Sequence, residues 1–341
     1  MEIAQTLCTA QELIDVLDLG GFEGRSDVMK CILAASDKFM RKGGNFVPMI
    51  GSKTFYVEGN NRSEVLYFPA LLSITSLTIN GETISTDNYR FVPSNRMWEN
   101  GPYIGIELIG YSWPCSSDIP IVINGVWGLY NLTSSLGVSV TQATSTETTV
   151  VVTNGALLSP GMVLLVESEQ EHVISGAGSP GSPAGTTATS KVNGAIVQGD
   201  VQVQVDNGAE FHEGETLQVD VEDMYILRIG GNLLSVKRGW NGTEVVEHVD
   251  DSVIRVYRTF GVVRGVNGTT AAAHSNKVLS RYVVPETINH YAISLASRMR
   301  MSAETAFSGS SGNSEFGGSR YMVEIPPGQI EKVLEDFNVG D

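Results

Sequence analysis

Residues 66–82 read LYFPALLSITSLTINGE, and this stretch decides the fold of the first part of the chain. Polar and apolar residues alternate along Ser73–Ile79 except at the polar pair Thr75-Ser76, as in a strand with one buried face. The Asn80-Gly81 pair that follows is the strongest short-range signal of a β-hairpin. The same period of two recurs on both sides, with no helix pattern between, in Lys53–Glu58, Glu64–Phe68, Tyr89–Val92, Tyr103–Ile109 and Ile119–Trp127. The pattern predicts a mainly antiparallel sheet of roughly six short strands.

Helix signals lie on either side of this sheet. Thr9 and Glu12 have the spacing of a capping box, and a wide apolar stripe follows Ser26 and ends at Gly43-Gly44. Pro285 suits the first turn of a later helix. The apolar residues at helical spacing in that helix are Ile288, Ala292, Leu295 and Met299. A short amphipathic helix is expected near the end of the chain, with its apolar face made by Ile330, Val333, Leu334 and Phe337.

Between about Val138 and Tyr282 the chain is rich in Val, Thr and Gly, lacks helix signals and repeats itself. The stretch TVVVTNGALLSPG at 149–161 resembles QVQVDNGAEFHEG at 202–214, at an offset of 53 residues. A second pair, RGWNGT at 238–243 and RGVNGT at 264–269, has an offset of 26, and His248 and His274 keep that offset. A plain tandem array would give one offset, so we infer that one β module is nested inside the other.

These boundaries divide the chain into a frame and an insertion. The frame is 1–130, with the first helices and a β-leaf, and 285–341, with the last helices. The insertion is 138–283, in which 138–173 pairs with 259–284 and 195–258 forms the nested module. The sequence therefore predicts an α+β fold: terminal helices packed with a small, mainly antiparallel leaf, plus an inserted all-β domain of two related modules.

The composition limits the classes of partner. The chain has 38 Asp and Glu against 22 Lys and Arg, a net charge of −16, so it is poorly suited to gripping nucleic acid. The three cysteines, Cys8, Cys31 and Cys115, have no metal spacing and suit reduced thiols in a cytoplasm. No start region resembles a signal peptide, and no apolar run reaches transmembrane length, so no membrane association is expected.

The residues with chemical potential form no recognisable active site. Gly176–Gly181 matches G-x-G-x-x-G, but Pro183 and a Thr run follow where a phosphate-binding helix would have to start. The pairs Asn241-Gly242 and Asn267-Gly268 are better explained as tight turns than as glycosylation sites. The equivalent positions of His248 and His274 suggest a shared structural hydrogen bond rather than a metal.

A cluster of carboxylates in the insertion also admits two explanations. It is made by Glu167, Glu169, Asp220, Glu222 and Asp223. A calcium site is one explanation, but no loop places ligands at alternate positions around a central Gly. Solvated strand faces are the explanation we adopt, so neither a metal nor a cofactor is expected. No nucleophile–base set is visible, and no enzymatic activity is expected.

The frame resembles the head–tail connector, or adaptor, family of tailed phages. The residues that carry the resemblance are AASDKFMRKGGNF at 34–46, LYFPALLSITSLTINGE at 66–82, YRFVP at 89–93 and IPIVINGVWG at 119–128. Members of that family look like a helix ending in a basic and glycine-rich stretch, a leaf of short strands, and closing helices. The resemblance covers about 1–130 and 285–341, and the insertion departs from the family pattern.

The resemblance implies a structural virion protein of the phage neck, made in the bacterial cytoplasm. It implies a homo-oligomeric ring, commonly a dodecamer, that joins the portal protein to a downstream neck or tail protein. DNA would pass through the channel without specific binding, and the acidic charge suits such a lumen. The C-terminal arm, with Ile330, Val333, Leu334 and Phe337, would dock on a partner, and the insertion would project outward from one point on the leaf.

Two other functions remain open from the sequence. The chain could be another virion part, such as a baseplate protein or a receptor-binding adhesin. An adhesin would bind its ligand on the β modules, with Trp240 at a loop tip as the candidate contact. A hydrolase is the third and weakest alternative.

Overall fold

The computed structural model describes residues 4–22, 27–57, 64–94 and 102–304, together with the short strands β19 (Ser310–Ser311) and β20 (Ser319–Arg320). Over these residues the fold is mainly β. Three sheets of six strands each dominate, and three α-helices accompany them. The predicted α+β class is therefore wrong. The reason is that each sheet buries an apolar core of its own, so the β units are full domains and the leaf is as large as the others.

The first sheet, which we call the leaf, spans residues 49–127. Its strands are β1 (Met49–Val57), β2 (Val65–Ile79), β3 (Glu82–Thr83), β4 (Tyr89–Val92), β5 (Tyr103–Leu108) and β6 (Ser116–Trp127). They pair in the order β1-β6-β2-β5-β4, with β3 attached to β2, and every pairing is antiparallel. Asn80 and Gly81 both take positive φ, as the expected tight hairpin turn requires.

The second sheet, module one, is built from two separate chain segments, 133–175 and 259–282. The first segment supplies β7 (Thr133–Gln142), β8 (Thr149–Val151), β9 (Val163–Val166) and β10 (Glu169–Ser175). The second supplies β17 (Thr259–Arg264) and β18 (His274–Tyr282). The sheet order is β7-β18-β9-β10-β17-β8, so β10 pairs directly with β17 across the intervening chain.

The third sheet, module two, comprises residues 186–256, which lie in sequence between β10 and β17. Its strands are β11 (Thr186–Lys191), β12 (Gln202–Gln204), β13 (Thr216–Val219), β14 (Glu222–Gly230), β15 (Leu233–Trp240) and β16 (Val253–Val256). Their order, β11-β16-β13-β14-β15-β12, repeats that of module one strand for strand. In module one the chain leaves the sheet after β10 to form module two. At the equivalent point in module two, Gly231 and Asn232 connect β14 directly to β15.

Three helices form a layer beside the β units: α1 (Ala10–Val16), α2 (Asp27–Gly43) and α3 (Glu286–Glu304). The predicted capping box of Thr9 and Glu12 is present at the start of α1. In the core of this helical layer, Ile32 and Phe39 of α2 lie with Ile288 and Leu295 of α3. Residues far apart in the sequence thus depend on each other for burial.

The helical core also includes residues from outside the helices. Phe46 and Leu129 join it from the base of the leaf, and Trp240 joins it from the end of β15 in module two. The expectation that the insertion attaches at one point on the leaf is therefore wrong. A large aromatic side chain of module two fills the helical core, because burial of such a side chain is strongly favourable.

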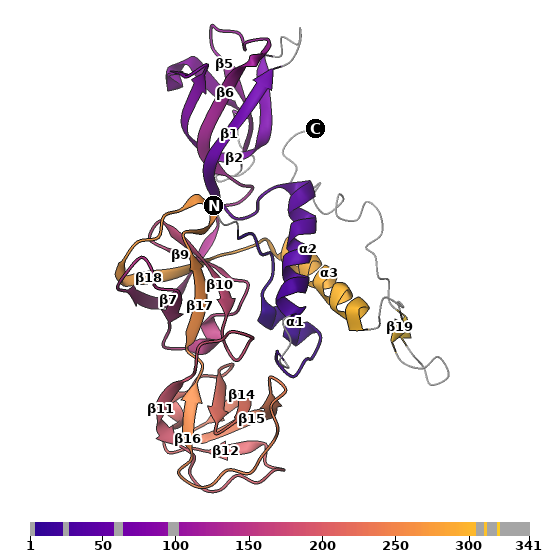
Figure 1. The fold of residues 1–341 in the computed structure, drawn as a ribbon, viewed down its shortest axis with the longest axis vertical. Helices are drawn as coiled ribbons and strands as arrows, with labels where there is room; N and C mark the ends of the chain where they lie inside the picture. Colours follow the sequence, from indigo (N-terminus) through magenta and orange to yellow (C-terminus); the bar gives the residue numbers. More distant parts are fainter. Residues whose placement is uncertain are drawn as a thin grey trace.

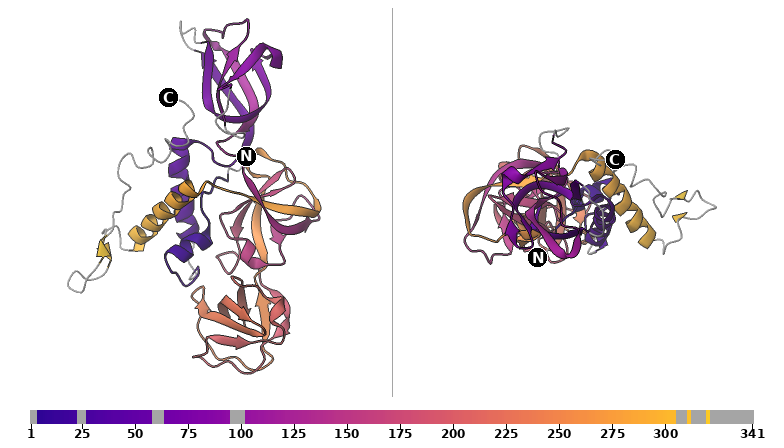
Figure 2. Two further views of the ribbon diagram at one scale, coloured as in Figure 1. Left: turned by 180° about the vertical axis from the view of Figure 1, so that it is seen from behind. Right: turned by 90° about the horizontal axis from the view of Figure 1, so that it is seen from above.

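The leaf, module one and module two follow one another along the long axis of the molecule, and the helical layer lies to one side of them (Figure 1). The views from behind and from above show the same arrangement, with α2 and α3 beside the β units (Figure 2). Across the residues that the structure describes, no helix combines the length and the apolar character needed to cross a membrane.

Candidate functional site

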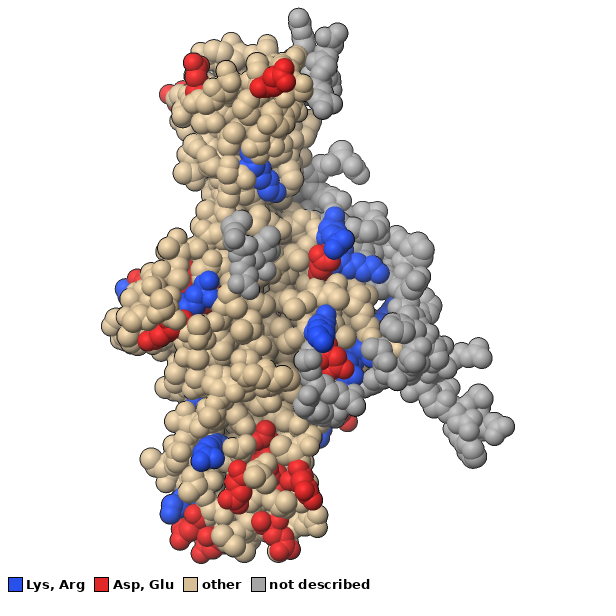
Figure 3. Space-filling model, viewed as in Figure 1, with Lys and Arg blue, Asp and Glu red and all other residues tan. Residues whose placement is uncertain are grey.

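The outward face of α2 is basic, in a protein that is acidic as a whole. One side of the helix packs into the core through the buried residues Val28, Ile32, Ala35 and Phe39. The opposite side exposes Lys30, Leu33, Lys38 and Arg41, and the Leu33 side chain is 47% exposed. Asp37 is exposed there too and pairs with Arg41 at 2.9 Å, which leaves the two lysines in excess. Lys and Arg gather over the helical layer, whereas Asp and Glu crowd the far end of module two (Figure 3). This face suits an acidic partner with some apolar surface.

The outer face of the leaf is free of charge where its three longest strands lie side by side. Three cross-strand rows run over β1, β6 and β2. They are Ile50–Val126–Ser73, Ser52–Asn124–Ser76 and Thr54–Val122–Thr78. Asn124 donates to the Ser76 hydroxyl at 2.8 Å, which satisfies polar groups within the face. Depletion of charge is typical of the centre of protein–protein interfaces.

The interface residues predicted near the C-terminus, Ile330, Val333, Leu334 and Phe337, lie outside the described residues. The two exposed faces described above, on α2 and on the leaf, were not singled out from the sequence. The exposed stripe of α2 lies opposite the apolar stripe that the sequence predicted. The helical period therefore contained enough information to identify the exposed side of this helix.

Module one contains a buried cluster of charged side chains around Glu169. Arg264 donates from Nε and Nη2 to the two Glu169 oxygens, at 2.9 and 2.6 Å. His274 Nε2 lies 2.8 Å from Glu169 Oε2, and the Ala272 amide donates to the same oxygen at 2.8 Å. Glu169 is only 1% exposed, so each of these contacts replaces water.

Module two repeats the cluster at the matching positions. Arg238 donates to Glu222 from Nε at 2.6 Å and from Nη2 at 2.7 Å. His248 Nε2 lies 3.0 Å from Glu222 Oε2, and the Val246 amide donates to that oxygen at 3.1 Å. Glu222 is fully buried. The expected shared hydrogen bond of His248 and His274 is thus confirmed, and its acceptor is a buried carboxylate in both modules.

The carboxylates assigned to solvated strand faces divide into two groups. Glu167 and Asp220 are partly exposed and contact the outer ring nitrogens of His274 and His248. Glu169, Glu222 and Asp223 are buried, so the expectation of solvated faces is wrong for these three. The alternation along β10 and β14 does not show this, because the partners are supplied by other strands and turns. Arg264 and Arg238 neutralise Glu169 and Glu222, and Asn241 and Tyr257 bond to Asp223.

The surroundings of these carboxylates shift their pKa values in different directions. Burial alone would raise the pKa of Glu169, but bonds from Arg264, the Ala272 amide and His274 outweigh it and lower the pKa. Glu222 behaves likewise through Arg238, the Val246 amide and His248. Burial raises the pKa of Glu171 and of Asp223.

We expect acid to weaken both modules through Glu169 and Glu222. A carboxylate with a lowered folded pKa stabilises the fold fully above its unfolded pKa, and this stabilisation is lost as pH falls through the folded pKa. Urea unfolding from pH 7 to pH 3 should therefore show a loss of stability below about pH 4.3, the ordinary Glu value.

Glu171 and Asp223 have raised pKa values, so their protonation in acid favours the folded state. Their contribution to the pH dependence of stability must be separated from that of Glu169 and Glu222. The variant Glu222→Gln keeps them and removes one of the lowered carboxylates. Its stability should fall less steeply with acid than that of the natural chain. Parallel curves for the two proteins would contradict a role for Glu222 in the acid response.

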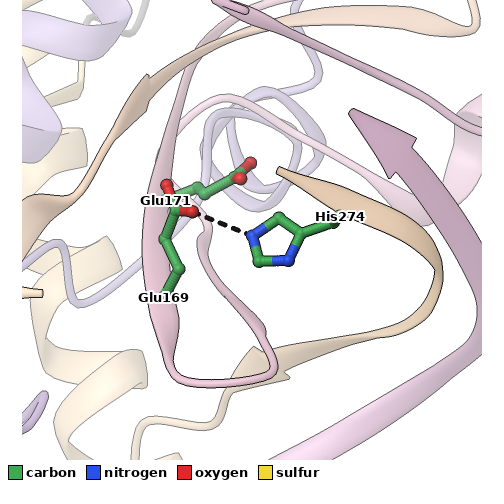
Figure 4. A group of neighbouring side chains, drawn as sticks. All are labelled: Glu169, Glu171 and His274. Carbon is green, nitrogen blue, oxygen red and sulfur yellow. Dashed lines mark hydrogen bonds and ion pairs between the residues drawn. The ribbon is translucent and has the colours of Figure 1, made fainter. Parts of the chain in front are cut away.

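Glu169, Glu171 and His274 also form the one group of three potential metal ligands found in the described part of the chain, with ligand atoms within 4.8 Å of one another (Figure 4). Arg264 already provides the positive charge there, since its Nε also lies 3.1 Å from Glu171 Oε1. The oxygens of Glu169 are taken by Arg264, His274 and backbone amides. A metal ion would have to displace the guanidinium, so the residues present do not favour a metal centre.

The other residues that the sequence singled out for chemistry or binding are not placed to bind a ligand. Gly176–Gly181 is followed by strand β11 and not by a helix, as expected, so it offers no helix N-terminus to a phosphate. Cys8 is buried, and burial raises its thiol pKa to about 12, which makes it unreactive. Trp240, the candidate adhesin contact, is 5% exposed and packs in the helical core.

Searches against protein-family models, characterised proteins and solved structures find no match to this chain. The surfaces and clusters above therefore have to be interpreted from their own geometry. Two of them, the outer leaf face and the outward side of α2, are free to contact other molecules. The two Arg–Glu–His clusters are internal and hold the modules together.

Proposed function

We propose that this chain is a structural subunit of a tailed-phage neck, a head–tail connector that assembles into a ring. The observation that carries the proposal is the shared core of the helical layer. Helices from the two ends of the chain pack with the base of the leaf, in the order in which the connector-like stretches occur in the sequence. The chain would act by assembly and not by catalysis.

The two free surfaces support this proposal because they differ. The leaf offers an uncharged face, and α2 offers a basic face that would repel a second copy of itself. Rings need heterologous interfaces, in which one surface of a subunit meets a different surface of the next. Partners of the assembled ring would be the portal protein above it and a neck or tail protein below it.

The alternative function, a receptor-binding adhesin, loses its sequence-based candidate. A ligand-binding tryptophan must reach solvent, and Trp240 instead stacks on Tyr225, with ring centroids 4.6 Å apart, inside the helical core. We therefore favour the connector.

The proposal predicts rings that depend on the leaf face. Negative-stain images of the full chain mixed with the portal protein of the same phage should show stacked rings. The variant Ser52→Lys/Thr54→Lys places two charges on exposed positions of β1 and should abolish the rings while leaving the circular dichroism spectrum unchanged.

The matched control adds the same charge elsewhere on the leaf. Thr86 and Ser112 are exposed, lie in connections outside the three rows and pair with none of their members, so Thr86→Lys/Ser112→Lys should still form rings. A chain that stays monomeric with portal but binds bacterial cells or glycan arrays would refute the connector and favour the adhesin. Rings formed equally by both double variants would refute the role of the leaf face.

A further inference from the structure

The two Asn-Gly turns of the repeat have a second property besides reversing the chain. Asn241 and Asn267 take φ values of 57° and 55°, the left-handed conformation expected of such turns. Asn241 is 8% exposed and Asn267 is fully buried. Turn residues usually face water. These two are covered instead by the N-terminal segment of the chain, residues 4–22.

In module one, the side chain of Asn267 hydrogen-bonds to both the amide and the carbonyl of Ala4. Its Oδ1 accepts from the Ala4 amide at 2.9 Å, and its Nδ2 donates to the Ala4 carbonyl at 2.7 Å. The amide side chain thus pairs with one residue as a neighbouring strand would. Nδ2 also donates to Gln170 Oε1 at 2.8 Å, which orients the amide group.

In module two, Asn241 binds the backbone of the same segment further along. Its Oδ1 accepts from the Phe22 amide at 2.9 Å, and its own amide donates to the Gly20 carbonyl at 2.7 Å. Nδ2 donates to Asp223 Oδ2 at 2.9 Å. A Cβ on Gly21 would lie 2.4 Å from Asn241 Oδ1, and Gly21 has φ +85°, so glycine is needed there.

Both turns are supported by residues at matching positions of the repeat. Gln170 and Asp223, which orient the two asparagines, differ by the same 53 residues as the rest of that repeat. The backbone amide of Gln170 donates to the Thr269 hydroxyl at 3.0 Å, and the backbone amide of Asp223 donates to the Thr243 hydroxyl at 2.9 Å. The same construction therefore occurs twice, and each copy holds a different stretch of main chain.

We infer that each β module carries a binding site for a polypeptide backbone, and that the N-terminal segment is the resident ligand of both sites. The hydrogen bonds that Asn267 and Asn241 make with this segment are to amides and carbonyls, so recognition depends on main-chain conformation, with glycine required at Gly21. The two sites fasten the helical layer to module one and to module two.

The test uses glycine at the two asparagines of the full chain. Glycine adopts positive φ without strain, so Asn267→Gly and Asn241→Gly remove the side-chain amide and leave the turn. Amide exchange followed by NMR should show about tenfold faster exchange at Ala4 in Asn267→Gly, with Phe22 unchanged. Asn241→Gly should give the reverse pattern.

A matched control is available in the same sheet. Asn276 also has positive φ, at 50°, but it is exposed and lies away from the N-terminal segment, so Asn276→Gly should leave both amides protected. Unchanged protection of Ala4 in Asn267→Gly, or equal losses in all three variants, would overturn the inference.

A second experiment measures the segment as a ligand. A protease recognition sequence inserted between Phe22 and Asp27 allows the folded chain to be cut after purification. The fragment should stay bound on size exclusion, and a labelled peptide of residues 1–22 should exchange into its place. With both asparagines changed to glycine, the fragment should dissociate more than tenfold faster. Dissociation at the natural rate would show that apolar packing alone retains the segment and would refute the two sites.

Discussion

Replacing Arg264 by alanine is expected to lower the free energy of unfolding by about 3–5 kcal/mol, the cost of removing one partner from a buried ion pair. Arg264 neutralises Glu169 and also contacts Glu171, and both carboxylates are buried. Without the guanidinium, two carboxyl groups and the ring of His274 would share a site that water does not reach. Equilibrium unfolding in urea measures the loss.

The matched control for this substitution is an arginine–glutamate pair on the surface. Arg90 donates to both oxygens of Glu107 at 2.8 Å, with the geometry of the Arg264 pair but in contact with water. Arg90→Ala should change stability far less, because water replaces the lost bonds. Arg238→Ala in module two should resemble Arg264→Ala. Equal effects of Arg90→Ala and Arg264→Ala would contradict the assignment of a buried structural cluster.

Deleting residues 138–283 and joining the ends with a short linker is expected to unfold the helical layer, although every helix remains in the shortened chain. The deletion removes Trp240 from the helical core and removes the surface that covers residues 4–22. Isolated helices of this length are marginal in water without tertiary packing. The loss should appear as reduced helical circular dichroism and as rapid amide exchange in 27–43.

A smaller excision separates the contribution of module two. Replacing 178–258 by Gly-Asn joins β10 to β17 through the turn that joins β14 to β15, because positions 178 and 258 match Gly231 and Asn232 at the two repeat offsets. Module one should fold in this variant, and Ala4 should stay protected, while Phe22 loses its partner. A helical layer that stays fully protected after the larger deletion would contradict its dependence on the β modules.

Local features of the fold could be predicted from the sequence where neighbouring residues determine them. The capping box at Thr9, the hairpin turn at Asn80-Gly81 and the start of α3 after Pro285 each follow from interactions within a few residues. The period of two along 66–82 gave a strand because its alternate residues could pack on one core.

The fold class could not be predicted in the same way, because it depends on how residues far apart share their burial. Nothing in the sequence around Trp240 shows that its ring enters a core made by helices from the two ends of the chain. Glu169 and Glu222 were assigned to solvent for the same reason, since their arginine partners lie on other strands. The two repeat offsets did contain a signal for the clusters. Glu169, Arg264 and His274 have their counterparts in module two at these offsets, namely Glu222, Arg238 and His248.

The turn at Gly231 and Asn232 also bears on how a chain of this kind can lengthen. Module two enters module one at the equivalent turn, and all six strands of module one remain paired around it. Gly231 and Asn232 are exposed, so a third copy inserted there would likewise leave the strands of module two in register. An architecture of this kind can therefore grow from within, by adding copies at an interior turn, and each addition leaves the helical layer unchanged.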